Sequence, residues 1–411
     1  MRTNPTRAVA IIFAFVTLSS VLAGEFSTYY LEDMFKSLEK YYLYSQNMDW
    51  PALKSQALET AKETKTIEEA YPAVREALET IADANITFEG KDVLDARAER
   101  ARLGSLGFRI STDLVIFEVY ANSPLDKIGV HVGDLLEAID GAPLEVAIDG
   151  SYALQGKTVE LDVIRNGEPL RFTVTRGAVD FVRPLRAGRL GKGAYLEPGT
   201  MVGSDFIGTS LEAKQLQQSL HDLETSGACG FVIDARRDGG NMVAKWLGFA
   251  SLLPEKLAQF RTNSDVYEWK VTPEGLLTAS SPKSGSSETD GSVNAAQFRL
   301  KRPQAPVALL TDGLTFNNDS LIPFLSRDKA ITRFFGRSQT RPSLRSWTIN
   351  LSNSRDTLNV PWAQVTDATG LDVERLEVDE SLEMDYVGFG TKNDHVIQAA
   401  QTWLESQPAC K

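Results

Sequence analysis

The stretch from Gly230 to Asn241 reads GFVIDARRDGGN, and it continues as MVAKWLGFASLL over residues 242–253. Residues 231–233 form a continuous apolar run rich in β-branched side chains, which predicts a short buried strand. Apolar residues from Val243 to Leu253 recur at helical spacing, which predicts a helix. A strand that ends in glycines and opens a helix directs backbone N–H groups at one point, where an anion or a developing oxyanion could bind. The alternative is a turn with a purely structural role.

Composition limits the class of protein. The chain has 411 residues, which predicts two or three domains, and 42% of them are hydrophobic, which is ordinary for a globular protein with a real core. The formal net charge of -12 and the lack of a basic stripe argue against a nucleic-acid partner. The three histidines, His131, His221 and His395, are scattered. We therefore expect no metal site and no cofactor.

Residues 1–23 have the pattern of a secretory signal peptide. Arg2 and Arg7 flank the start of an apolar run that extends to Val16, and the small or short residues Val21 and Ala23 form a cleavage-site pattern. The pattern predicts export to the periplasm or the extracellular space. An uncleaved membrane anchor is the alternative. No later stretch reaches about 18 apolar residues, so we expect no stable membrane span after cleavage.

The only two cysteines are Cys229 and Cys410. Cys229 abuts the predicted central strand, which favours a buried free thiol. Export permits disulfides, so a bridge between the two cysteines is the alternative. Neither cysteine has a neighbouring histidine, and neither is therefore predicted to be a catalytic thiol or a metal ligand.

Residues 25–92 are predicted to be a small helical region without a catalytic constellation. Apolar side chains recur at helical spacing through this segment. Asp49 precedes Trp50 and Pro51, an order typical of a helix start in which the aspartate caps and the proline occupies the first turn.

From residue 102 to residue 178 the apolar period becomes that of strands. The motifs SLGF (105–108), NSPLDKIGVHVGDLLEAIDG (122–141) and GKTVELDVIRNGE (156–168) resemble a PDZ domain in order and spacing. In such a domain a peptide adds as a strand to a sheet edge. Backbone N–H groups around Leu106, Gly107 and Phe108 would hold its terminal carboxylate. A small β-barrel without a ligand is the alternative.

From residue 190 to residue 410 strands and helices alternate. Residues 194–196, 306–310 and 331–336 read as strands, residues 211–224 read as a helix, and the polar segment 280–292 reads as a surface loop. The alternation predicts an open α/β sheet, in which ligands bind at the carboxyl ends of the strands. The turns at 234–240 and 311–320 would both lie at that edge.

Together these motifs resemble the carboxyl-terminal processing, or tail-specific, serine protease family, which includes tricorn-like cores. Besides the segments above, the resemblance includes PVALLTDGLTFNND (306–319) and GLDVERLEVDE (370–380). It implies an α+β multidomain fold with a helical N-terminal region, a PDZ β-barrel and an α/β open-sheet core like that of ClpP and crotonase. It also implies that the PDZ groove captures protein C-termini, and that backbone N–H groups near Gly239 and Gly240 belong to an oxyanion loop.

The residues that the resemblance makes catalytic are absent. Asn317 stands at the position of the nucleophilic serine, and an amide cannot take that role. Pro342 stands at the position of the basic lysine, and Asn85 at that of the histidine found in other branches. The oxyanion motif also departs from the family, with Asp238 and Asn241 in place of an asparagine and a glycine. An acid at Asp238 would oppose a developing negative charge.

The sequence therefore predicts an exported, PDZ-containing relative of these peptidases that is catalytically inactive and binds peptides or protein C-termini. The alternative is an active serine endopeptidase with a rearranged site, for which Ser320 is the best nucleophile. Its nearest basic neighbours in sequence are Arg327 and Lys329. A serine misaligned by a few positions, and a cleft reused for carbohydrates or small molecules, are further alternatives.

Overall fold

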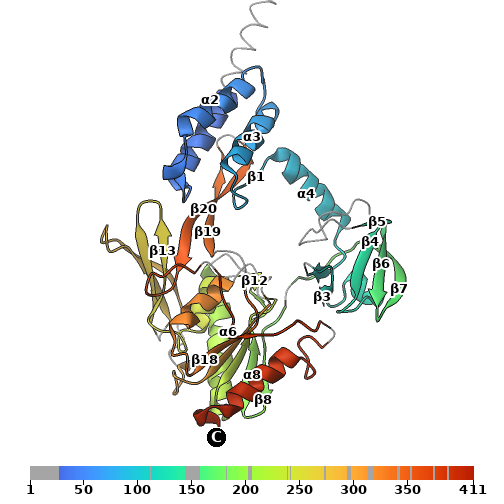
Figure 1. Ribbon diagram of the computed structural model, residues 1–411, viewed down its shortest axis with the longest axis vertical. Coiled ribbons are helices and arrows are strands. Elements are labelled where there is room, and N and C mark those ends of the chain that lie inside the picture. Colours follow the sequence, from blue (N-terminus) through green and yellow to red (C-terminus); the bar gives the residue numbers. More distant parts are fainter. Residues whose placement is uncertain are drawn as a thin grey trace, which may run out of the picture. The chain divides into compact units, whose positions relative to one another are not determined.

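The computed structural model describes the chain from residue 27 onward, apart from short internal segments. The described ranges are 27–111, 113–143, 158–181, 183–201, 206–237, 239–240, 242–272, 275–293, 298–312, 318–339, 343–351, 354–373, 375–386 and 388–411. The predicted signal peptide lies outside them. The chain divides into two compact units, and each is described by itself (Figure 1). Unit 1 comprises residues 1–99, 262–264 and 344–364, and unit 2 comprises residues 100–261, 265–343 and 365–411.

Unit 1 is mainly helical, as predicted for the N-terminal region. A helix over residues 27–41 is followed by α2 (Trp50–Thr60), η2 (Glu68–Ala70), α3 (Tyr71–Ile81) and the start of α4 (Lys91–Leu103). The Asp49 side chain caps α2 by accepting from the N–H of Ala52 at 3.1 Å, which confirms the predicted helix start.

A small antiparallel ribbon completes unit 1. Strand β20 (Thr357–Thr366) pairs with β1 (Thr87–Glu89) and with β19 (Leu344–Asn350). The helices and this ribbon share one apolar core, which includes Phe35, Val74, Leu358 and Val360. Residues near position 350 thus complete a core that begins near position 30.

The centre of unit 2 is a mostly parallel sheet, as the alternation of strands and helices predicted, and the strand predicted at residues 231–233 lies within it. Its strand order is β21 (Glu380–Ser381), β18 (Thr332–Arg337), β17 (Val307–Asp312), β11 (Phe231–Asp234), β9 (Gly193–Glu197) and β8 (Arg186–Leu190). Every residue of β11 and β17 is buried. Continuous apolar runs are expected for parallel strands that are covered on both faces.

Helices cover both faces of this sheet. The face that includes Phe231 and Ile233 shares a core with α6 (Phe206–Thr225) and α7 (Met242–Gly248). The opposite face, which includes Val232, packs against α8 (His395–Ser406) (Figure 1). Alternate side chains of one strand thus enter different cores because successive residues point to opposite faces of the sheet. The predicted α+β class with several sheets is confirmed.

The two cysteines form a disulfide, so the predicted free thiol at Cys229 is wrong. The bond joins Cys229, just before β11, to Cys410 in the terminal η5 (Pro408–Cys410), with the Cα atoms 5.0 Å apart. The error arose because 181 residues separate the two positions. Only the packing of α8 on the sheet brings the C-terminus beside β11.

A second antiparallel sheet in unit 2 corrects another expectation. It contains β13 (Lys256–Thr262), β14 (Val266–Val271), β15 (Leu276–Ser280) and β16 (Ser287–Ser292). The polar segment 280–292 was predicted to be a surface loop, but its second half is β16 and pairs with β15. Ladder hydrogen bonds to a neighbouring strand stabilise this sequence in spite of its weak local β propensity.

The PDZ-like region of unit 2 has its own apolar core. It contains β2 (Phe108–Ile110), β3 (Ile116–Val119), α5 (Pro124–Lys127), β4 (Leu135–Ile139), β5 (Ala142–Pro143), β6 (Thr158–Arg165) and β7 (Glu168–Thr175). Asn166 and Gly167, both at positive φ, turn the β6–β7 hairpin, as their sequence indicates. The predicted boundaries at 102–178 and 190–410 stay predictions.

Candidate functional site

The turns singled out in the sequence leave from one edge of the central sheet. Strands β9, β11, β17 and β18 run parallel, so their carboxyl ends share that edge. Gly239 and Gly240 form the short strand β12 (Gly239–Gly240), which pairs in parallel with β10 (Thr200–Met201). Asn317, Pro342, Asp238 and Asn241 lie outside the described residues. The structure therefore describes the strands and the glycine turn around the predicted site. The identities of those four residues are known from the sequence alone.

A buried arginine fastens the start of this turn. Arg236 donates from Nε and Nη2 to the two carboxylate oxygens of Asp234, at 2.9 and 2.8 Å. It also donates to both oxygens of Asp394, at 3.2 and 2.7 Å. The Asp394 carboxylate in turn caps α8 by accepting from the N–H groups of Val396 and Ile397. One guanidinium thus joins the end of β11 to the start of α8.

These contacts keep both Asp234 and Arg236 charged at the start of the turn. Burial alone would raise the pKa of Asp234, but the charge and hydrogen bonds of Arg236 outweigh it and hold the pKa below its usual value. Burial would likewise lower the pKa of Arg236, and its two carboxylate partners raise it instead. Tyr195 on β9 donates to Asp234 at 2.8 Å. The Asp234 carboxylate therefore stays ionised, and it acts as an anchor.

Arg237 holds the backbone directly before the glycines. Its φ of 93° is in the left-handed region, which costs a non-glycine residue about 1–2 kcal/mol. Its N–H donates to Asp312 at the end of β17, and its side chain donates to Glu197 at 2.7 Å. Its carbonyl accepts from Arg183 and, at 3.5 Å, from Arg109. Contacts on every side therefore offset the strain and fix the entry to the Gly239–Gly240 turn.

The PDZ-like region contributes to the same charged network. Glu118 of β3 is 3% exposed, and it forms ion pairs with Arg183 at 2.9 Å and with Arg109 at 3.4 Å. Arg183 also pairs with Glu197 at 3.2 Å. Because buried ion pairs need several partners to offset desolvation, this continuous network fixes the local geometry more than it adds stability. Charged groups thus run from β3 to the turn after β11.

The three residues predicted to bind peptides lie at the start of β2. Leu106 and Phe108 are buried in the core of the PDZ-like region, so only their backbone could meet a ligand. Gly107 has a φ of 83°, and a Cβ atom there would lie 2.2 Å from Cβ of Ser123. The carbonyls of Leu106 and Gly107 accept from the N–H groups of Leu125 and Tyr120. Close packing therefore requires glycine at position 107.

Asn85, the predicted position of a lost histidine, lies in an exposed turn of unit 1. Its backbone N–H and its side-chain amide both donate to Oδ1 of Asp83 at 2.8 Å. This is an Asx-type turn, in which asparagine is favoured for local structural reasons. The side chain has a structural role in the turn.

Ser320, the alternative nucleophile, is 1% exposed in η4 (Asn318–Ser326). Arg327 is no base for it, since its guanidinium donates to the carbonyls of Leu252, Pro303 and Ala305. Burial lowers the pKa of Arg327 to about 10, so it stays charged at neutral pH. Lys329 is exposed.

Sequence reasoning missed Lys245. This lysine is 1% exposed in α7. The segment just after α7 is also buried, since the Phe249 ring packs on Phe324 of η4 with the ring centroids 5.7 Å apart. A charged residue inside the apolar pattern of 242–253 was the signal, because lysine is almost never fully buried.

The described residues contain neither a metal-binding cluster nor a membrane-spanning helix. No group of three or more His, Cys, Asp or Glu side chains in this part of the chain could hold a metal ion. Within the same ranges, no helix has the length and apolar character needed to cross a membrane.

Comparison with known sequences gives a family. Residues 199–384 match the model of peptidase family S41. The chain is 27% identical over 235 residues to a carboxyl-terminal-processing protease of Synechocystis sp. (strain ATCC 27184 / PCC 6803 / Kazusa). That match covers 52% of this chain and 53% of the relative, so the chain spans about half the length of the curated protein it matches.

Comparison with solved structures gives the fold. The photosystem II D1 C-terminal processing protease superimposes with a TM-score of 0.61 at 16% identity, covering 93% of this chain and 98% of that one. A lipoprotein from Streptococcus agalactiae superimposes with a TM-score of 0.51 at 14% identity, covering 92% and 96%. The sequence match makes residues 199–384 similar to peptidase family S41, and the likenesses to solved structures show that the chain shares their fold.

Proposed function

We propose that this chain is an exported S41-family protein that binds peptides or protein C-termini through a PDZ domain at residues 102–178 and does not hydrolyse them. The ligand would add to β2 as an extra strand. Its terminal carboxylate would meet the backbone N–H groups of residues 106–108.

The open edge of β2 is the observation that carries this proposal. Among the described residues β2 pairs with β3 alone, so its other edge is left for a peptide strand. The carbonyls of Leu106 and Gly107 are already used by internal N–H donors, and the positive φ of Gly107 turns the backbone sharply beside this edge. A carboxylate-binding loop needs such a backbone.

Two observations support the absence of hydrolysis. Asn317 and Pro342 occupy the sequence positions where the family's nucleophile and base are expected. Ser320, the other serine considered, is 1% exposed, so its hydroxyl is not accessible to a peptide bond. General-base catalysis supplies about 10²–10⁴-fold, and no base is placed by motif to activate another serine.

The disulfide supports an extracytoplasmic location. Disulfides persist in oxidising compartments and are rare in the cytosol. The Cys229–Cys410 bond therefore agrees with the signal-peptide pattern at residues 1–23.

Binding can be tested by fluorescence anisotropy with labelled peptides that end in apolar residues. We expect a peptide with a free C-terminus to bind at least about tenfold more tightly than the same peptide amidated, because the amide removes a charge-assisted contact. Gly107→Ala should abolish binding by forcing the loop away from Ser123. Gly167→Ala is the matched control, since Gly167 has almost the same φ and open space around its Cβ position.

Equal affinity for the free and amidated peptides would overturn carboxylate capture. Hydrolysis is tested separately with an unfolded substrate that has an apolar C-terminus. We expect no cleavage. Cleavage that is lost in Ser320→Ala would instead establish the alternative, an active peptidase with a rearranged site.

A further inference from the structure

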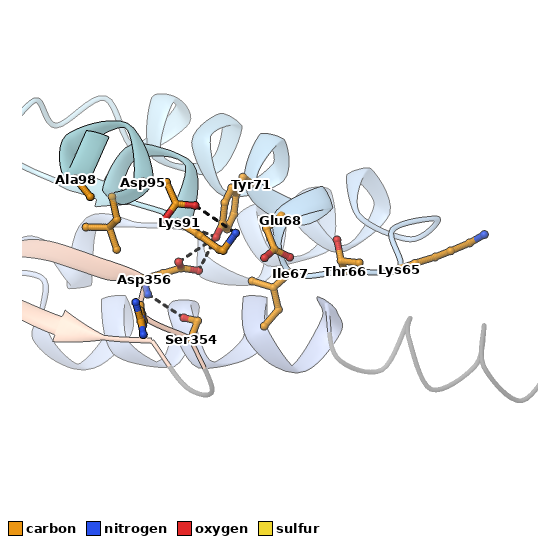
Figure 2. Close-up of a pocket in the computed structure, with 12 residues that line it drawn as sticks. Lys65, Thr66, Ile67, Glu68, Tyr71, Lys91, Asp95, Ala98, Ser354 and Asp356 are labelled. Carbon is orange, nitrogen blue, oxygen red and sulfur yellow. Dashed lines mark hydrogen bonds and ion pairs between the residues drawn. The ribbon is translucent and has the colours of Figure 1, made fainter. Parts of the chain in front are cut away.

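A cavity of about 680 Å³ lies within unit 1 and has no part in the proposed function. Its walls come from η2 and the start of α3, from the first turns of α4, and from the segment before β20 (Figure 2). Ile67, Leu94 and Ala98 are apolar residues of its lining. The volume is in the range of small-molecule sites, about 300–1,000 Å³.

The lining of the cavity includes a buried carboxylate. Asp356 is 1% exposed, and its oxygens accept from the hydroxyls of Tyr30 at 2.7 Å and of Tyr71 at 2.9 Å. The Tyr71 hydroxyl in turn accepts from the backbone N–H of Lys91 at 3.0 Å. Figure 2 shows Asp356 and Tyr71 directed toward one another. The carboxylate therefore lies behind a tyrosine hydroxyl that is itself fixed in place.

This carboxylate has no cationic partner among the described side chains. Lys91, which lines the cavity, pairs with Asp95 at 3.3 Å and not with Asp356 (Figure 2). Hydroxyl dipoles offset only part of the cost of burying a charge, and buried charges are usually paired with an opposite charge. The charge of Asp356 also acts on the cavity across a medium of low dielectric, where Coulomb attraction is weakly screened.

We propose that the cavity binds a small organic cation, a primary ammonium on a short apolar stem, which supplies the counter-charge for Asp356. The stem would pack on Ile67 and Leu94. The exposed basic side chains Lys65 and Arg355 also line the cavity, so a ligand with a carboxylate at its far end should bind more tightly. A free amino compound and the side chain of a lysine in a peptide share this chemistry.

Ligand-observed NMR on the full chain at pH 7 tests the proposal with three matched compounds. We expect hexylamine to bind with a dissociation constant on the order of 1 mM, 6-aminohexanoate to bind more tightly, and hexanoate not to bind. A blocked tripeptide with lysine at its centre is the competitor. Displacement of hexylamine by this peptide would identify a protein side chain as the ligand source, and lack of displacement would identify a free small molecule.

Three variants test whether hexylamine binds in this cavity and not elsewhere on the protein. Asp356→Asn should weaken hexylamine binding at least about tenfold, because it removes the charge at nearly constant shape. Ala98→Trp should block the cavity while leaving Asp356 and both tyrosines untouched. Glu63→Gln removes the same charge at an exposed residue that does not line the cavity, and it should change nothing.

Binding of hexylamine that is unchanged in Ala98→Trp would overturn the proposal, as would hexanoate binding as tightly as hexylamine. Circular dichroism checks the fold of each variant. If Asp356→Asn fails to fold, Ala98→Trp decides the question by itself.

Discussion

Each unit of this protein buries a carboxylate that ties together distant parts of the chain, but the two units satisfy that charge differently. In unit 2, Asp234 is bound by the guanidinium of Arg236 and the hydroxyl of Tyr195. In unit 1, Asp356 is bound by the hydroxyls of Tyr30 and Tyr71, without a cation among the described side chains. Unit 2 also has a disulfide. The comparison shows that an arginine neutralises the charge at the sheet edge, whereas the described side chains around Asp356 stabilise its charge with hydroxyl dipoles.

The disulfide should give the largest effect on unit 2. Replacing both cysteines, in Cys229→Ser with Cys410→Ser, opens a loop of 181 residues and should lower the free energy of unfolding by about 5 kcal/mol in the chain-entropy account. Urea denaturation measures the loss, and hydrogen exchange assigns it to unit 2. The unsubstituted protein under a strong reductant should approach the double variant. Equal stability of the oxidised and reduced proteins would contradict this expectation.

Arg236→Ala should have the next largest effect, because it leaves Asp234 and Asp394 buried and unpaired. We expect a loss of about 3–5 kcal/mol in the free energy of unfolding, measured by urea denaturation. Arg186→Ala is the control. It removes a half-exposed guanidinium from Glu197 and should cost at most about 1 kcal/mol.

The pH dependence of stability should distinguish Arg236→Ala from the unsubstituted protein. The pKa of Asp234 is lowered in the folded state, so its contribution is present above the unfolded pKa of about 3.9 and is lost as the pH falls through the folded value. In Arg236→Ala, the main group that opposes burial is lost, so the pKa of Asp234 should rise and acid should cost the variant less stability. Parallel acid profiles for the two proteins would contradict the anchoring role of Arg236.

Tyr30→Phe should have the smallest of the three effects, and it tests unit 1. The variant keeps the ring and removes one hydroxyl from Asp356, at a cost of about 1–3 kcal/mol in the free energy of unfolding. Tyr29→Phe in the same helix is the control, since Tyr29 is 53% exposed.

Alkaline pH gives a second readout for Tyr30. Burial, together with Asp356, raises the pKa of Tyr30 above its ordinary value. Its contribution is therefore complete below the unfolded pKa of about 10 and is lost as the pH rises through the folded value. Tyr30→Phe should lose less stability in alkali than the unsubstituted protein does. Identical alkaline profiles would show that folding does not raise the pKa of Tyr30.

Local sequence predicted those elements whose stability depends on neighbours in the chain. The buried strand at residues 231–233 was predicted because three consecutive apolar residues can be buried only between two covered faces. The start of α2 was predicted because Asp49 and Pro51 act within one helical turn. The strand at 287–292 was missed because its stability comes from pairing with β15 and not from its own residues.

The sequence predicted the sheet edge and the glycine turn, but it did not predict the buried side chains that hold this turn in place. The sheet edge and the Gly239–Gly240 turn follow from motif and alternation. Arg236 appeared only as part of a charged turn, although its guanidinium joins β11 to α8. Lys245 was overlooked although a lysine inside an apolar helical pattern signals a buried charge, because that pattern was interpreted only as a helix face.

By itself, the sequence determined the parallel strands, their glycine-bearing turn, the family resemblance and the identities of Asn317 and Pro342, since each of these is a property of a short segment. Only the tertiary structure decided the pairing of Cys229 with Cys410 and the meeting of Tyr30 with Asp356, which are 326 residues apart. The physical reason is the sequence separation over which each interaction acts. Periodicity and turn chemistry act over a few residues, whereas these contacts form when separately built elements pack and close loops of hundreds of residues.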